Sequence, residues 1–205
     1  VLNTDYSITS GGIGTGSNTV TLRWLTTGSK TVTINYNNAS GCSALSATSS
    51  TATNVTGPTA TAGAALTAIC SGGTSAAMGG SIGGTATIGT WSGGTGTWTN
   101  ATNPSTATYT AGASESGTVT LTLTTSGGAC GTTTATKNIT VNARPTVTFT
   151  AQPGASACAN TDVTYTTQSG QSNFVWTVPG VLNTDYSITS GGIGTGSNTV
   201  TLRWL

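Results

Sequence analysis

The feature that most constrains this sequence is a long exact repeat. Residues 1–25 and residues 181–205 are identical at every position, reading VLNTDYSITSGGIGTGSNTVTLRWL. One copy begins at Val1 and the other at Val181, and self-similarity at a fixed period is the signature of a repeat array. This period of 180 exceeds the solenoid units of about 20–50 residues and suits one large domain or two ordinary ones. We therefore expect the chain to be a window on a longer tandem array.

The hydrophobic pattern predicts an all-β fold. Threonine, β-branched and polar, suits the solvent face of a strand, and the chain has 50 threonines against only five basic and four acidic residues. In residues 173–178 both faces are apolar, with Phe174 and Trp176 on one and Val175 on the other, which predicts a central strand. Apolar residues alternate with a period of two, as in strands, over residues 18–24, 30–36, 118–125, 145–151 and 173–178.

The scarcity of charge argues against several functional classes. A nucleic-acid binder needs a basic face, a calcium site needs clustered carboxylates, and a zinc site needs His or close pairs of Cys. The chain has no His, so its serines and threonines lack the usual catalytic base. We expect a protein that is not an enzyme, with no cofactor, no metal and no nucleic-acid partner.

Four cysteines divide the period into two similar units. The stretch from Cys70 to Cys130 is nearly as long as the stretch from Cys158 to the next copy of Cys42. The later cysteine of each unit follows a strong strand pattern. This spacing predicts a Cys70–Cys130 disulfide, with Cys42 and Cys158 each paired to a neighbouring copy outside this chain. Disulfides indicate an oxidising compartment; free buried thiols are the alternative.

The same division predicts the domains. Residues 57–143 form a complete sandwich, residues 1–56 the C-terminal part of the preceding one, and residues 144–205 the N-terminal part of the next. Each full unit has about 90 residues, the size of a small β-sandwich. Neither partial piece should be stable alone, because each lacks the strands that complete its sheets.

A tryptophan lies between the cysteines of each unit. Trp91 in the middle unit, and Trp176 and Trp24 in the split unit, are predicted to pack in the cores. The Cys–Trp–Cys order is similar to that of immunoglobulin-type sandwiches. Stacking against sugars is the alternative role for these side chains.

Longer motifs resemble those of a known class of repeat. The middle unit contains ICSGG, GTWSGGTGTW, ATYT and GTVTLTLTT, and the split unit contains CANTDVTYTT, FVWTVPG and TVTINYNNASGC. These resemble the Ig-like and PKD-like repeats of giant Bacteroidota cell-surface proteins, and they cover nearly the whole period. The resemblance extends to the SprB-type gliding adhesins, which are substrates of the type IX secretion system held on the outer membrane.

The resemblance implies a tandem array of Ig-like and PKD-like β-sandwich domains in an extracellular filament attached to the cell surface. The expected function is reach and mechanical strength for attachment and gliding motility. Expected partners are neighbouring copies of the repeat, and anchoring or motility machinery reached through other regions, with surface polysaccharide as a further candidate. A sheath or pilus-like fibre of packed chains, and a carbohydrate-binding spacer of a secreted enzyme, remain alternatives.

Overall fold

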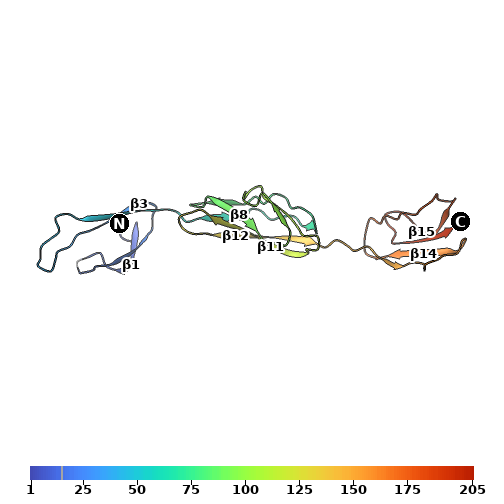
Figure 1. Cartoon of the computed structure of the whole chain (residues 1–205), viewed down its shortest axis with the longest axis horizontal. Helices are drawn as coiled ribbons and strands as arrows, with labels where there is room; N and C mark the ends of the chain where they lie inside the picture. The colour runs from blue at the N-terminus through green and yellow to red at the C-terminus, as the bar shows by residue number, and fades with distance from the viewer. Residues whose placement is uncertain (15) are drawn as a thin grey trace. The chain divides into compact units, whose positions relative to one another are not determined.

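The computed structural model describes residues 1–14 and 16–205. Among these residues all the regular secondary structure is β-strand, as the sequence predicts. The chain divides into two compact units, Val1–Ala143 and Arg144–Leu205, drawn from blue to yellow and from orange to red in Figure 1. No helix long and apolar enough to cross a membrane occurs in the described residues.

Residues 1–56 form two small antiparallel sheets. β1 pairs with β2, and β3 pairs with β4 along the whole of both strands, from Gly28↔Asn54 to Ile34↔Thr48. None of the described residues in 1–14 and 16–56 is fully buried, so this segment has no core of its own. Its strands are β1 (Tyr6–Gly11), β2 (Val20–Trp24), β3 (Gly28–Ile34) and β4 (Thr48–Asn54).

The rest of the first unit is built on a four-stranded sheet in the order β6-β12-β11-β8. Its centre is the long hairpin of β11 and β12, visible in Figure 1. Two two-stranded sheets, β5–β7 and β9–β10, accompany it. The strands are β5 (Thr59–Thr61), β6 (Ile69–Cys70), β7 (Ser81–Gly83), β8 (Ile88–Ser92), β9 (Thr97–Thr99), β10 (Thr108–Thr110), β11 (Gly117–Ser126) and β12 (Thr134–Asn142).

Alternation along β11 and β12 produces the core of this unit. Every second residue is buried on β11 from Val119 to Thr125 and on β12 from Lys137 to Val141, because successive side chains point to opposite faces of a strand. Side chains from the small sheets pack against these residues, among them Tyr109 from β10 and Ile82 from β7. This arrangement of small sheets around one core is compatible with a β-sandwich.

The second unit has one four-stranded antiparallel sheet in the order β13-β14-β16-β15. Its buried residues are Tyr186, Val200 and Leu202, with partly buried apolar residues packed around them. The strands are β13 (Phe149–Ala151), β14 (Asp162–Thr167), β15 (Tyr186–Gly191) and β16 (Thr199–Trp204).

One predicted strand does not form. Residues 173–178, expected as a central strand, are irregular, and Val175 is 85% exposed. The backbone amide of Phe174 donates to the carbonyl of Thr195 at 3.1 Å, but no strand of this unit lies along the segment to form a ladder. The segment has the apolar alternation of a strand, but it is not paired with any of the four strands of this unit.

Candidate functional site

The two copies of the repeated sequence fold alike but are buried differently. The β1–β2 and β15–β16 hairpins share their register and the same irregularity, which falls at Ile8/Ser10 in one and Ile188/Ser190 in the other. In the second copy, Val200 and Leu202 are 1% and 2% exposed, whereas their equivalents Val20 and Leu22 are only half-buried.

The second copy packs against neighbours that the first copy lacks, both on β14 and in the irregular segment that holds Trp176 and Val178. β14 pairs with β16 from Asp162↔Arg203 to Thr166↔Thr199, and no strand pairs with the free edge of β2 in the part of 1–56 that the structure describes. Burial of the repeated segment therefore depends on the sequence that precedes it.

An open hollow of about 420 Å³ in the second unit is lined by apolar side chains together with threonine, glutamine, serine and asparagine. The exposed Phe149 and the half-buried Trp176 face each other there, with ring centroids 6.1 Å apart. The β3–β4 region of the first unit also exposes apolar groups, among them Ile34 and Tyr36. Exposed apolar faces of this kind on sheets mark missing packing partners or binding surfaces.

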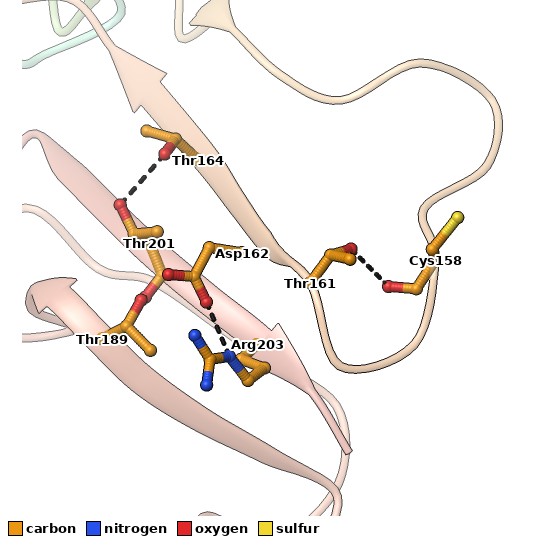
Figure 2. Close-up of polar contacts among 7 residues, drawn as sticks. All are labelled: Cys158, Thr161, Asp162, Thr164, Thr189, Thr201 and Arg203. Carbon is orange, nitrogen blue, oxygen red and sulfur yellow. Dashed lines mark hydrogen bonds and ion pairs between the residues drawn. The ribbon is translucent and has the colours of Figure 1, made fainter.

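The loop before β14 is anchored to the far end of the sheet. The amide of Asn160, whose φ is 59°, donates to the carbonyl of Trp204 at 2.7 Å, and the Thr161 hydroxyl donates to the carbonyl of Cys158 at 2.6 Å. Figure 2 shows the Thr161–Cys158 bond near the Asp162–Arg203 ion pair, whose Nε–Oδ1 distance is 2.8 Å, with the sulfur of Cys158 pointing away from the sheet. The thiol is exposed.

Threonine hydroxyls form cross-strand pairs on the solvent faces. Thr164 and Thr201 lie opposite each other on β14 and β16, with their hydroxyl oxygens 3.0 Å apart, as Figure 2 shows. Hydrogen-bonded threonine pairs stabilise neighbouring strands without charge. Similar contacts join Thr31 to Thr51, Thr33 to Ser49, Thr61 to Ser81 and Thr74 to Thr110.

The structure contradicts the predicted Cys70–Cys130 disulfide. Cys70 pairs with Asn142 at the last residue of β12, whereas Cys130 lies in the loop that precedes Thr134 at the other end of that strand. At about 3.4 Å per residue, the strand separates them by roughly 27 Å, and a disulfide needs Cα atoms within about 7 Å. All four cysteines have free, exposed thiols, which also differs from the alternative of buried thiols.

Cys42 and Cys130 occupy similar positions in the two halves of the period. Each lies in the loop of a long hairpin, β3–β4 for Cys42 and β11–β12 for Cys130. The Asn38 side chain orders the first loop by accepting the amide of Cys42 at 3.0 Å. The sulfur of Cys130 lies 3.9 Å from the carbonyl oxygen of Val55.

The tryptophans predicted for the cores differ in burial. Trp91 is fully buried, and its indole N–H donates to the carbonyl of Pro104 at 3.0 Å. Trp176 is half-buried against the second core and donates to the carbonyl of Ser197 at 2.8 Å. Trp24 is half-buried and contacts Tyr6 edge-to-face, with centroids 5.7 Å apart.

A carboxylate closes one end of the middle sheet. Glu115 accepts the Tyr109 hydroxyl at 2.5 Å and the amides of Thr95 and Gly112 at 2.8 and 3.0 Å. Burial opposes ionisation of Glu115, but these hydrogen bonds outweigh it and hold its pKa below the ordinary value. Burial, together with the bond to Glu115, raises the pKa of Tyr109. These contacts connect the loops that hold Thr95 and Gly112, and both carboxylate oxygens of Glu115 accept hydrogen bonds.

Lys137 is a buried cation inside the middle core. Its Nζ donates to the carbonyls of Ala64 and Met78 at 2.8 and 2.6 Å, and lies 5.7 Å from the centroid of the Trp91 ring. Burial lowers the pKa of Lys137 because a low-dielectric surrounding disfavours the charged amine. The hydrophobic alternation of β12 did not predict a lysine at an inward position.

Two aspartates bind neighbouring groups of the chain. Within residues 1–14 and 16–205, no three His, Cys, Asp or Glu side chains lie together to hold a metal ion. The Asp185 carboxylate accepts the amide of Val181 at 2.6 Å, and Asp162 is engaged by Arg203. These carboxylates support local structure.

No protein-family model, curated protein or solved structure matches this chain. Two features point to a function. One is the pair of incomplete faces, around Phe149 and Trp176 and around Ile34 and Tyr36; the other is the placement of the cysteines at the ends of the sheets. Sequence reasoning found the cysteines but assigned the wrong partner to Cys70, because spacing along the chain does not show at which end of a strand a loop lies.

Proposed function

We propose that this chain is a structural segment of a long extracellular filament, built from tandem Ig-like and PKD-like β-sandwich domains and used for surface attachment and gliding motility. The observation that carries the proposal is that the sequence of residues 1–25 occurs again at 181–205, and that Val20 and Leu22 are half-buried whereas their equivalents Val200 and Leu202 are buried. A sequence that depends on its neighbour for burial is suited to an array.

The two incomplete faces support the same proposal. Residues 144–205 leave Phe149 and Trp176 around an open hollow, and residues 26–56 carry a hairpin with exposed Ile34 and Tyr36. In an array with a period of 180, the sequence of residues 26–56 follows Leu205 directly. The next copy therefore supplies the β3–β4 hairpin to cover the hollow and complete a PKD-like domain.

The surface chemistry suits an extended tether outside the cell. Cross-strand threonine pairs replace charged residues on the wet faces, and charged residues are 4% of the chain. Few Lys and Arg leave few sites for trypsin-like proteases. The partners that we propose are neighbouring copies of the repeat, with anchoring or motility machinery and surface polysaccharide contacted through other regions. The segment itself carries no catalytic role.

Imaging of an array with a known number of copies tests this function. Atomic force microscopy of chains with three and six periods should show single strings of beads whose contour length doubles. Sheets or bundles of laterally packed chains would overturn the tether and favour a sheath. A length that does not grow with copy number would overturn the repeat architecture itself.

A further inference from the structure

We infer that successive domains of the array are joined by disulfides across their junctions, Cys70-type to Cys42-type and Cys158-type to Cys130-type. This inference rests on the proposed array. For each domain we call the end where the chain enters its leading end, and the end where it leaves its trailing end.

In the middle domain, residues 57–143, Cys130 lies at the leading end. A Cβ on Gly84, which has a φ of 65°, would collide with the carbonyl of Gly57 at the start of the domain. Thr85 follows Gly84 in the sequence, and a Cβ on Gly128 would lie 2.7 Å from the Thr85 carbonyl oxygen. The loop of Cys130 is therefore beside the incoming linker, and its sulfur lies 3.9 Å from the carbonyl of Val55.

Cys70 lies at the opposite, trailing end of this domain. It pairs with Asn142 at the end of β12, and the amide of Ser71 donates to the carbonyl of Asn142 at 2.9 Å. The chain leaves the domain directly after this residue. The Cys70 thiol is exposed at this end.

In the split domain, Cys158 lies at the trailing end. The chain enters at β13, where Phe149 pairs with Thr167 at one end of β14. The loop of Cys158 precedes Asp162 at the other end, and it is fixed to the sheet by the bond from Asn160 to Trp204.

The first copy shows that the chain also leaves the split domain at that end. Trp24 is the equivalent of Trp204, and Thr26 follows it closely. The Thr26 carbonyl accepts the side-chain amide of Asn54, the last residue of β4, at 2.6 Å. The loop of Cys158 lies at the end of β16, and the exit from β4 lies at the end of β2, which is the equivalent of β16 in the first copy.

Cys42 is placed at the leading end of the split domain. The β3–β4 hairpin begins with Gly28↔Asn54 at the trailing end and runs to Ile34↔Thr48. That is roughly 20 Å at about 3.4 Å per residue, comparable to the length of β14. The loop beyond Ile34 holds Cys42 at the end opposite the exit.

The two domain types therefore share one polarity. Each has its later cysteine at the leading end and its earlier cysteine at the trailing end. Where one domain follows another, an exposed thiol from each lies at the junction. No two of the four cysteines in this chain meet at the same junction, which agrees with their four free thiols.

Forming each bond needs an oxidant. Two thiols lose two protons and two electrons to become one disulfide, and a disulfide reagent such as oxidised glutathione accepts them and becomes two thiols. In cells a disulfide-carrying oxidoreductase would supply the same chemistry.

The bonds would give the array two continuous covalent paths. Cys42 precedes Cys70 by the same number of positions as Cys130 precedes Cys158. A Cys70–Cys42 bond joins the segment from Cys42 to Cys70 to the same segment of the next copy. A Cys158–Cys130 bond likewise joins the segment from Cys130 to Cys158 to the same segment of the next copy. On each path, one of these short segments then spans a whole period. Such a segment is about 100 Å long when fully extended.

Peptide mapping under non-reducing conditions tests the pairing. The substrate is this chain lengthened by one further copy of residues 26–205 and oxidised with glutathione disulfide. Trypsin is unsuitable because the segment from Thr31 to Lys137 contains three of the four cysteines. A protease that cuts after aromatic residues and leucine separates all four.

We expect Cys70-type peptides joined to Cys42-type peptides, and Cys158-type peptides joined to Cys130-type peptides. The chain of residues 1–205 alone should yield no peptide pair that links two cysteines of one molecule. Cys70→Ser in the first copy should remove the first link only, and the matched control, Cys130→Ser in the added copy, should remove the second only.

Cys70–Cys130 and Cys158–Cys42 pairs, or no cross-links between copies, would overturn the inference. Imaging separates this outcome from a failure of the proposed function. Strings of beads without junction disulfides would leave the tether intact, whereas laterally packed chains with the predicted disulfides would overturn the tether alone.

Discussion

Val200 lies directly opposite Tyr165 in the pairing of β14 with β16, and only 1% of its surface is exposed. Its equivalent in the first copy, Val20, has no such partner and is half-buried. The same sequence therefore has two environments in one molecule, and the second provides an internal control for the first. Burial, rather than local propensity, distinguishes the two copies.

Leucine truncation should have different consequences in the two copies. Leu202→Ala removes a side chain that is 2% exposed and should destabilise the second unit by about 2–4 kcal/mol. Leu22→Ala alters a half-buried equivalent and should cost less than about 1 kcal/mol. Amide exchange, followed by NMR, should rise at least about thirtyfold along β16 in the first variant and less than about fivefold along β2 in the second. Equal effects would contradict the difference in burial.

Moving the ends of the chain should stabilise the split domain. A rearranged chain with residues 144–205 followed by residues 26–143 places the β3–β4 hairpin after β16, as in the array. Covering the apolar hollow beside Phe149 and Trp176 should reduce binding of the dye ANS and raise the midpoint of urea unfolding. Unchanged dye binding would show that the hairpin does not cover that face.

Glu115 should make stability depend on acid. Its pKa is lowered in the folded protein, so its contribution is complete above the unfolded value of about 4.3 and is lost as pH falls through the folded value. Glu115→Gln should destabilise the middle domain by about 1–2 kcal/mol at neutral pH, and the difference from the parent should shrink towards pH 3. Urea unfolding at both pH values measures this, with the exposed Ser116→Gln as control. A difference independent of pH would exclude the carboxylate as its source.

Lys137 should act in the opposite pH range. Its folded pKa is lowered by burial, so between the folded and unfolded values the unfolded chain binds more protons and stability rises with pH. Lys137→Met should leave the carbonyls of Ala64 and Met78 without this donor, at a cost of about 1–3 kcal/mol. In urea unfolding, the cost should increase as pH approaches about 10.4, the ordinary value for lysine. A constant difference across this range would argue against a buried charge.

Local patterns predicted much of the fold. Alternation over residues 118–125 predicted the inward face of β11, and Trp91, predicted as a core residue from its place between Cys70 and Cys130, is buried. The prediction for β11 succeeds because period-two alternation is a direct consequence of strand geometry. Residues 173–178 show where pattern is insufficient, since a strand also needs a neighbour.

The cysteines show a different limit. Their spacing suggested a bond within one domain, but Cys70 aligns with Asn142 while Cys130 precedes Thr134. Which end of a sheet a loop occupies depends on strand direction and on the parallel pairing of β6 with β12, and neither is visible in the sequence. The inward Lys137 was missed for a similar reason, because its carbonyl partners come from distant loops.

Single-molecule stretching of a multi-copy array tests the account most directly. A reduced array should unfold in discrete steps, domain by domain, and lengthen to about 600 Å per period. The extension of the oxidised array should stop at about 100 Å per period, the reach of the short segment between linked cysteines. Smooth extension of the reduced array without unfolding steps would contradict a tether of folded domains, and an oxidised array that lengthens as far as the reduced one would contradict the junction disulfides.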